Sequence, residues 1–332
     1  FFLFNPTLSL SSLSIGYETL CASGFLIVTA LAIKLFNTQK LKLSRILLIS
    51  IGLILSFISS LQPRLIISGI FIGLVLFLKR THFKKSIYKL AVFVILVISL
   101  PSALILRNHF ASGLNVLSLN LGATMNIGAG EGATGGYMGT YKGVPCKLVS
   151  ENDLPTTNRL PSNYDRVRAL NDNKRIFCVL NWYLDNPTKL PQLFWNKTIY
   201  FWSPWIGPNS VGTMARNPWF QNNPLKTMSK TQEGFILVYG SFGKFVSWIW
   251  VLVSFSLLIL GLYRQSKIQG LSRLLSRISS SIIFPSWLVT LITLGDNRFR
   301  PPLLGSVITL QVFGIIYLWV KISGKKSNND IF

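Results

Sequence analysis

Seven apolar stretches divide the chain, and most are long enough to form a helix across a membrane, which takes about 20 apolar residues. The third stretch is short and needs a tilted or partly re-entrant path to span. Six spans are therefore the alternative to seven. The stretches run at 17–36, 45–61, 65–78, 90–106, 242–263, 278–294 and 301–320.

One connector differs from the others, because residues 107–241 are long, polar and rich in glycine and tryptophan. The pattern predicts an all-α polytopic membrane protein of about seven transmembrane helices, with a large mixed extracytoplasmic segment between helices 4 and 5. We divide the chain into a four-helix membrane block (1–106), the extracytoplasmic segment (107–241) and a three-helix membrane block with a cytoplasmic tail (242–332).

Three parts are expected within the extracytoplasmic segment. Residues 112–147 contain many glycines and predict a shaped loop rather than a helix, because glycine permits positive φ and close backbone approach. Residues 162–186 predict a polar helix. Residues 187–206 predict a helix at the membrane surface that ends at Pro204, since tryptophan and tyrosine prefer the headgroup level.

The net charge of +23 first suggests a nucleic-acid partner, but the placement of the charge argues against one. Basic clusters follow the odd-numbered spans, and Lys and Arg are retained on the cytoplasmic side during insertion. The clusters therefore indicate topology, with contact to anionic membrane lipids as a further use. They begin at Lys34, Lys79, Arg264 and Lys321.

The extracytoplasmic segment is basic too, with thirteen Lys and Arg against six Asp and Glu between Arg107 and Lys230. This excess suits an anionic ligand such as a lipid phosphate, or it forms a solvated surface. The cysteines Cys146 and Cys178 lie in this segment, and whether they pair stays open. With two histidines and no ligand spacing, no metal site and no cofactor are predicted, although a metal requirement stays open.

A few charged residues near the outer ends of the spans are candidates for a site. Arg64 is the only charge of a short outer hairpin, and Arg298 and Arg300 share a short outer turn, where two guanidinium groups could hold one phosphate. The alternative is that these arginines extend to lipid headgroups. Glu18 is a carboxylate inside a span, which indicates function by default, or it is merely interfacial.

Several short phrases, in order along the chain, resemble a known family. They are the glycine-rich phrase from Asn126 to Tyr137, the phrase Asn186-Pro187 followed by Lys197 and Phe201-Trp202-Ser203-Pro204, and the phrase Asp296 to Pro301. Together they resemble the multi-spanning glycosyltransferases of the GT-C type. More narrowly, the chain is similar to the bacterial dolichyl-phosphate-mannose-mannosyltransferase and aminoarabinose-transferase-like group.

The resemblance implies transfer of a sugar from a polyprenyl-phosphate donor to a lipid, glycan or protein acceptor on the outer face of the bacterial inner membrane. It implies a substrate site that includes Arg64, Asn126, Tyr137, Arg298 and Arg300, with Glu18 as an accessory residue. Family members carry their catalytic acidic residue in the first outer loop. That loop would precede Phe1, so we expect the true N-terminus to be missing from this chain, with an inactive relative of the family as the alternative.

Two rival interpretations remain open. One is an enzyme similar to O-antigen ligases, which would use a polyprenyl-linked oligosaccharide. The other is a transporter or a subunit that binds polyprenyl lipids without catalysis. Transporters usually carry charged residues within their spans or broken helices in pairs, and the span interiors here contain almost no charge.

Overall fold

The structure is a computed structural model that describes residues 17–77, 83–136, 143–150, 163–202, 232–265, 268–296 and 299–323. All regular elements in these ranges are helices, and no strand occurs among them. The predicted all-α class is therefore confirmed. The inserted segment, which was predicted to be of mixed structure, contains only helices and irregular backbone in its described part.

The first four apolar stretches form a packed helical block. Glycines bring these helices together, as Gly69 and Gly73 on α4 face Val97 and Phe93 on α5 so closely that an added Cβ would force those side chains to shift. Small residues are the usual means of helix association in lipid. The helices are α2 (Tyr17–Phe36), α3 (Leu41–Leu61), the short 3₁₀ turn η1 (Pro63–Leu65), α4 (Ile66–Phe77) and α5 (Phe83–Ser112).

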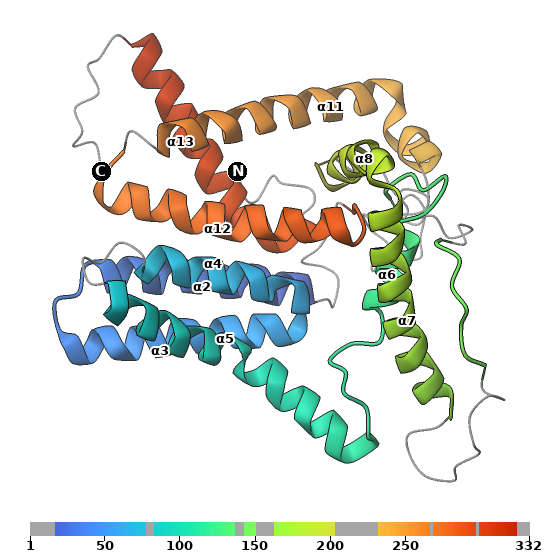
Figure 1. The fold of residues 1–332 in the computed structure, drawn as a ribbon. Helices are drawn as coiled ribbons and strands as arrows, with labels where there is room; N and C mark the ends of the chain where they lie inside the picture. The colour runs from blue at the N-terminus through green and yellow to red at the C-terminus, as the bar shows by residue number, and fades with distance from the viewer. Residues whose placement is uncertain are drawn as a thin grey trace.

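The last three long helices complete the same bundle. α12 (Gly270–Ile292) packs on α4, where the Ser68 hydroxyl lies 2.9 Å from the Ser286 hydroxyl and donates to the Ile282 carbonyl oxygen. α11 (Gln232–Gln265) packs on α13 (Leu304–Ile322), with the short turn η6 (Pro301–Leu303) before it. The residues on either side of the inserted segment therefore share one helical bundle (Figure 1).

Five helices within the described residues are long and apolar enough to cross a membrane. They indicate an integral membrane protein. The two remaining predicted spans correspond to shorter apolar helices, so the count of seven and the sidedness stay predictions. The five run at Tyr17–Phe36, Leu41–Leu61, Ile87–Ala111, Gly270–Ile292 and Pro301–Ile322, and the shorter two at Pro63–Phe77 and Val251–Gln265.

The described part of the inserted segment contributes the helices α6, α7 and α8 at one end of the bundle, which we call the insert end (Figure 1). The glycine-rich part contains a helix, α6, where the sequence predicted a shaped loop. The difference arises because α6 packs against α7, and this tertiary contact stabilises a seven-residue helix that the local sequence did not indicate. The predicted polar helix is confirmed as α7, and α8 lies within the predicted surface helix. The bounds are α6 (Leu121–Ile127), α7 (Asn163–Asp185), the 3₁₀ turn η3 (Pro187–Lys189) and α8 (Leu190–Trp202).

A disulfide between Cys146 and Cys178 ties the end of the glycine-rich part to α7, with 6.1 Å between the two Cα atoms. The pairing that the sequence left open is therefore present in the structure. A second contact fixes the same layer, because the Asp172 carboxylate on α7 accepts a hydrogen bond from the Ala123 backbone N–H on α6. These contacts make the described part of the insert a helical layer rather than a loose loop.

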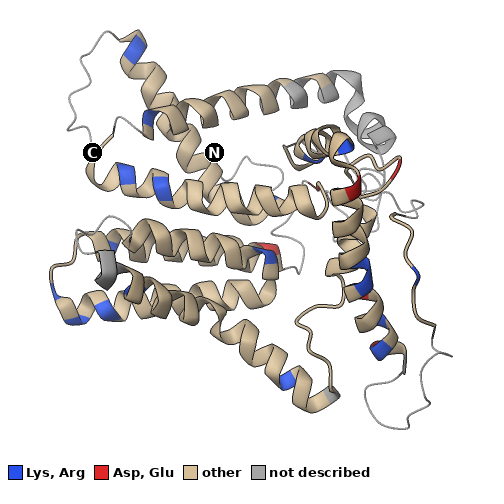
Figure 2. Ribbon diagram, viewed as in Figure 1, with Lys and Arg blue, Asp and Glu red and all other residues tan. Residues whose placement is uncertain are grey.

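Several Lys and Arg residues lie at the other end of the bundle, which we call the basic end (Figure 2). Lys34 lies in the last turn of α2, Arg45 in the first turns of α3, and Arg273 and Arg277 in the first turns of α12. Apolar side chains cover the surface between the two ends, including Leu26, Leu53 and Ile95, which are about half exposed. This distribution suits a bundle surrounded by lipid.

Candidate functional site at the insert end

Arg64 contacts the segment before the last helix directly. Pro63 begins the η1 turn, where its fixed φ and missing N–H suit a first helical position, and Arg64 follows it. The Arg64 guanidinium carbon lies 3.6 Å from the centroid of the Phe299 ring, and Nη2 donates to the Phe299 carbonyl oxygen at 3.4 Å. Stacking on the ring fixes the plane of the guanidinium group.

Glu18 lies in the first turn of α2 and is only 5% exposed. The start of α2 packs against η6, so Glu18 belongs to the same end of the bundle as Arg64. The thiol of Cys21, one helical turn after Glu18, is within electrostatic reach of both charges. The structure thus brings together two charged residues that the sequence had placed at separate outer ends.

Arg300 is buried and binds the end of α8. Its Nη1 donates to the Trp202 carbonyl oxygen at 2.8 Å and to the Phe201 carbonyl oxygen at 3.4 Å. A cation at the C-terminus of a helix satisfies carbonyl groups that have no partner within the helix. Burial lowers the pKa of Arg300 to about 10, so the side chain stays charged at neutral pH. Arg300 therefore joins the inserted segment to the last span.

Asn126 holds the backbone of its own segment. Its Oδ1 accepts a hydrogen bond of 2.7 Å from the Val144 backbone N–H, and an added Cβ at Gly143 would meet the same side chain. The structure therefore gives Asn126 a structural contact, and sugar binding by it stays a prediction. The predicted residues Tyr137 and Arg298 lie outside the described residues.

The glycine-rich part packs against the segment before the last span instead of forming an open cradle. The Gly135 carbonyl oxygen accepts a hydrogen bond of 2.9 Å from the Gly295 backbone N–H. An added Cβ at Gly128 would collide with the Thr293 carbonyl oxygen, and one at Gly295 would meet the Lys197 backbone. The glycines thus serve the close backbone approach that their composition suggested, and they place the insert beside Arg300.

Lys197 is the most deeply buried cation at this end, with no exposed surface. Its Nζ donates to the Tyr183 hydroxyl at 2.9 Å and to the carbonyl oxygens of Leu291 at 2.8 Å and Thr293 at 2.9 Å. The Tyr183 hydroxyl in turn donates to the Ile292 carbonyl oxygen at 2.7 Å. Burial lowers the pKa of Lys197 to about 7 and raises the pKa of Tyr183.

In the sequence, Lys197 was a further cation candidate within a family-like phrase, but it was not assigned to the substrate site, although a stronger signal exists. Lys197 is the only charged residue in α8, whose other residues are mostly apolar or aromatic. A single charge in such a helix usually has a buried partner. Its partners lie in α7 and at the end of α12, so their identity could not be read from local sequence.

Buried charge among the described residues is confined to the insert end. The buried charged residues are Glu18, Asp172, Lys197, Asp296 and Arg300. The interiors of the described spans bury serine, threonine and glutamine instead. Within the same residues, no group of three or more His, Cys, Asp or Glu side chains is placed to hold a metal ion.

Comparison of this chain with models of known protein families, with curated proteins and with solved structures finds no match.

Proposed function

We propose that this chain is a membrane glycosyltransferase that moves a sugar from a polyprenyl-phosphate donor to a lipid, glycan or protein acceptor at the insert end. The observation that carries the proposal is the gathering of Glu18, Arg64 and Arg300 at one end of a helical bundle, beneath the inserted segment. The bundle's apolar outer surface gives the donor's prenyl chain a place to lie in the membrane.

The reaction is a displacement at the anomeric carbon of the sugar. The acceptor oxygen forms a bond to this carbon, the bond from carbon to phosphate oxygen breaks, and polyprenyl phosphate leaves with the electron pair. The acceptor's proton goes to a general base. A guanidinium group at the leaving phosphate stabilises the negative charge that develops there.

Arg64 is the arginine that we assign to the donor phosphate. The Phe299 ring holds the plane of its guanidinium group, and phosphate binds at the edge of such a plane. Arg300 has a different role in this proposal, because its Nη1 binds α8 carbonyl oxygens and positions the insert. Glu18 orients the acceptor or balances the charge of Arg64 while the site is empty.

The confinement of buried charge to the insert end favours this proposal over a transporter. A transporter needs a path for its substrate through the membrane, and polar or charged side chains inside the spans usually mark that path. Some of the buried hydroxyl and amide groups of the described spans bond to neighbouring helices, as Ser68 does to Ser286 and Gln311 to the Ser254 carbonyl oxygen.

The test is binding of undecaprenyl phosphate to the full-length protein in lipid nanodiscs. Arg64→Ala should weaken binding about tenfold to a hundredfold, because a hydrogen bond to a charged group contributes about 1.5–3 kcal/mol. Arg64→Lys keeps the positive charge but loses the planar guanidinium group that binds phosphate through two hydrogen bonds. Its affinity for the lipid should lie between those of the wild-type and Arg64→Ala proteins. Arg45→Ala removes an exposed arginine from the basic end and serves as the control. Equal affinity of the Arg64→Ala and Arg45→Ala proteins would remove Arg64 from the donor site.

A further inference from the structure

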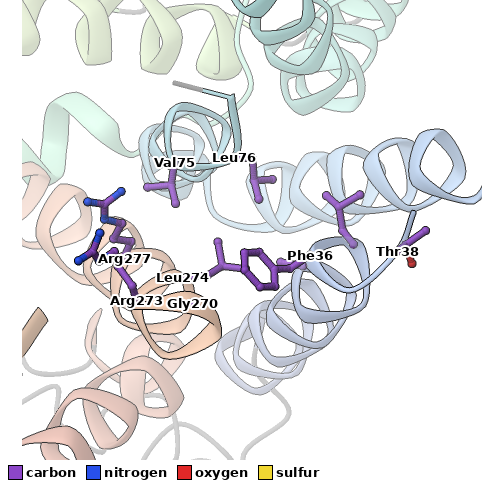
Figure 3. Close-up of a pocket in the computed structure, with 10 residues that line it drawn as sticks. Phe36, Thr38, Val75, Leu76, Gly270, Arg273, Leu274 and Arg277 are labelled. Atoms are coloured by element: carbon purple, nitrogen blue, oxygen red, sulfur yellow. The ribbon is translucent and has the colours of Figure 1, made fainter. Parts of the chain in front are cut away.

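A cavity of about 290 Å³ lies at the basic end, far from the site described above. It opens between α2, α4 and α12, and Figure 3 shows side chains from all three helices around it. α12 has 23 residues, so the cavity at its start lies roughly 30 Å from its end at the insert side. The lining includes Leu35, Phe36, Val75, Leu76, Arg273 and Arg277.

Two arginines supply the polar wall of this cavity. Arg273 and Arg277 are four residues apart on α12, so their side chains leave the same face of the helix (Figure 3). Nε of Arg273 donates to the Ile268 carbonyl oxygen, which fixes the direction of this side chain. Both side chains are partly buried, so the cost of removing their charge from water is partly incurred already.

The surrounding helices provide no carboxylate to balance these charges. The sequence has no Asp or Glu between Glu18 and Glu131, and none between Glu233 and Asp296. These intervals contain α3, α4, α5 and α12, nearly all of α2 and most of α11. Asp330 in the C-terminal tail lies outside the described residues. Two partly buried cations, with no carboxylate at this end on the described helices around them, favour an anion from outside the chain.

The other walls of the cavity are apolar. The apolar lining beside the arginines includes Phe36 on α2, Val75 and Leu76 on α4, and Leu274 on α12 (Figure 3). Leu35 on α2 lines the cavity as well. Phe36 is about half exposed, so the apolar wall continues onto the outer surface of the bundle. A free anion would gain nothing from these walls, whereas a molecule with a phosphate group and hydrocarbon chains would contact both surfaces.

We propose that this cavity binds the phosphate headgroup of an anionic membrane phospholipid, with Arg273 and Arg277 on the phosphate and the first part of an acyl chain against Leu35, Val75 and Leu76. The site is distinct from the donor site at the insert end and does not depend on the proposed reaction. It would hold the ends of α2 and α4 together with the start of α12 at a fixed depth in the membrane.

The proposal is tested by native mass spectrometry of the full-length protein, released from membranes of phosphatidylglycerol and phosphatidylcholine in equal amounts. The wild-type protein should retain one phosphatidylglycerol preferentially. The double variant Arg273→Gln with Arg277→Gln should retain it at least tenfold less. The control Arg45→Gln removes an exposed arginine of the same end that does not line the cavity, and it should behave as wild type.

Two further measurements keep the test decisive. Val75→Phe fills the cavity without changing charge and should also reduce retention, which covers the case in which the double variant fails to fold. Inorganic phosphate at millimolar concentration should not displace the lipid. Equal retention of the two lipids, or retention unchanged in both the double variant and Val75→Phe, would overturn the proposal. Displacement by inorganic phosphate alone would assign the arginines to a free anion and overturn the lipid.

Discussion

Arg300 at the insert end donates to two carbonyl oxygens of α8. Arg273 and Arg277 at the basic end line a cavity between α2, α4 and α12, and the one carboxylate of these helices, Glu18, lies at the opposite end of α2. The first end supplies protein groups for its cations, namely the α8 and α12 carbonyl oxygens, the Tyr183 hydroxyl and the Phe299 ring. The basic end does not supply an acid from its helices.

This difference separates two uses of a basic residue in a membrane protein. A cation whose partners come from the chain fixes one element against another, and its loss should lower stability. A cation whose counter-ion must come from outside the chain marks the level of the membrane surface, and its loss should change lipid binding with little effect on the fold. The predictions below test that division.

The largest effect is expected for Lys197→Met. The variant leaves the Tyr183 hydroxyl and the carbonyl oxygens of Leu291 and Thr293 without their buried donor, and each such group costs about 1–3 kcal/mol. The free energy of unfolding in detergent should therefore fall by about 3 kcal/mol or more. Chemical denaturation followed by tryptophan fluorescence measures it.

The matched control is Lys189→Met. Lys189 forms its ion pair with Glu131 on the surface, where about half of the lysine side chain is exposed. Ion pairs of this kind add little to stability. If both lysine variants unfold at the same denaturant concentration, the cluster around Lys197 does not hold the insert end together. Arg277→Gln at the basic end should also leave the unfolding transition in place.

A smaller effect is expected for Gly128→Ala. The new methyl group would collide with the Thr293 carbonyl oxygen, so the insert must move away from the end of α12 at a cost of about 1–3 kcal/mol. Gly132→Ala is the comparison, since Gly132 has φ of 78° and open space around its Cα. It should cost only the strain of the left-handed conformation, about 1 kcal/mol. A larger loss at Gly132 than at Gly128 would contradict the close packing.

The smallest effect is a pH dependence of stability. Burial lowers the pKa of Lys197 to about 7 from an ordinary value of 10.5, so above pH 7 the unfolded chain binds more protons than the folded one. Stability should therefore rise with pH, by about 1 kcal/mol between pH 7 and pH 8. The same titration of Lys197→Met should lack this rise. An equal slope in both proteins would assign the pH dependence to another group.

The membrane helices follow from the sequence because their signal is local. Residues 17–36 were predicted as an apolar stretch and form a helix with the same bounds, and the polar helix predicted at 162–186 is observed as Asn163–Asp185. Helix α5 is longer than its apolar stretch, because it includes basic residues before it and continues past Pro101 to Ser112. Apolar composition predicts which residues can cross the membrane, but it does not predict where the helix begins and ends.

The site was predicted only in part, because its contacts join distant parts of the chain. Arg64 was selected as a candidate because it is the only charged residue in its hairpin. Its stacking on Phe299, however, depends on how two distant helical hairpins pack against each other. Asn126 was selected within a glycine-rich phrase, yet its amide binds the backbone at Val144. The three oxygen partners of Lys197 belong to α7 and to the end of α12, and no local pattern connects them.

The arrangement around Lys197 also affects where α12 can end. The last carbonyl groups of a helix normally need water, and a helix that stops within hydrocarbon leaves them without partners. At the end of α12, the carbonyl oxygens of Leu291, Ile292 and Thr293 accept hydrogen bonds from Lys197 and Tyr183. This terminus therefore does not require water. The helix can end below the headgroup layer, because α7 and α8 cover its end and supply the hydrogen-bond donors.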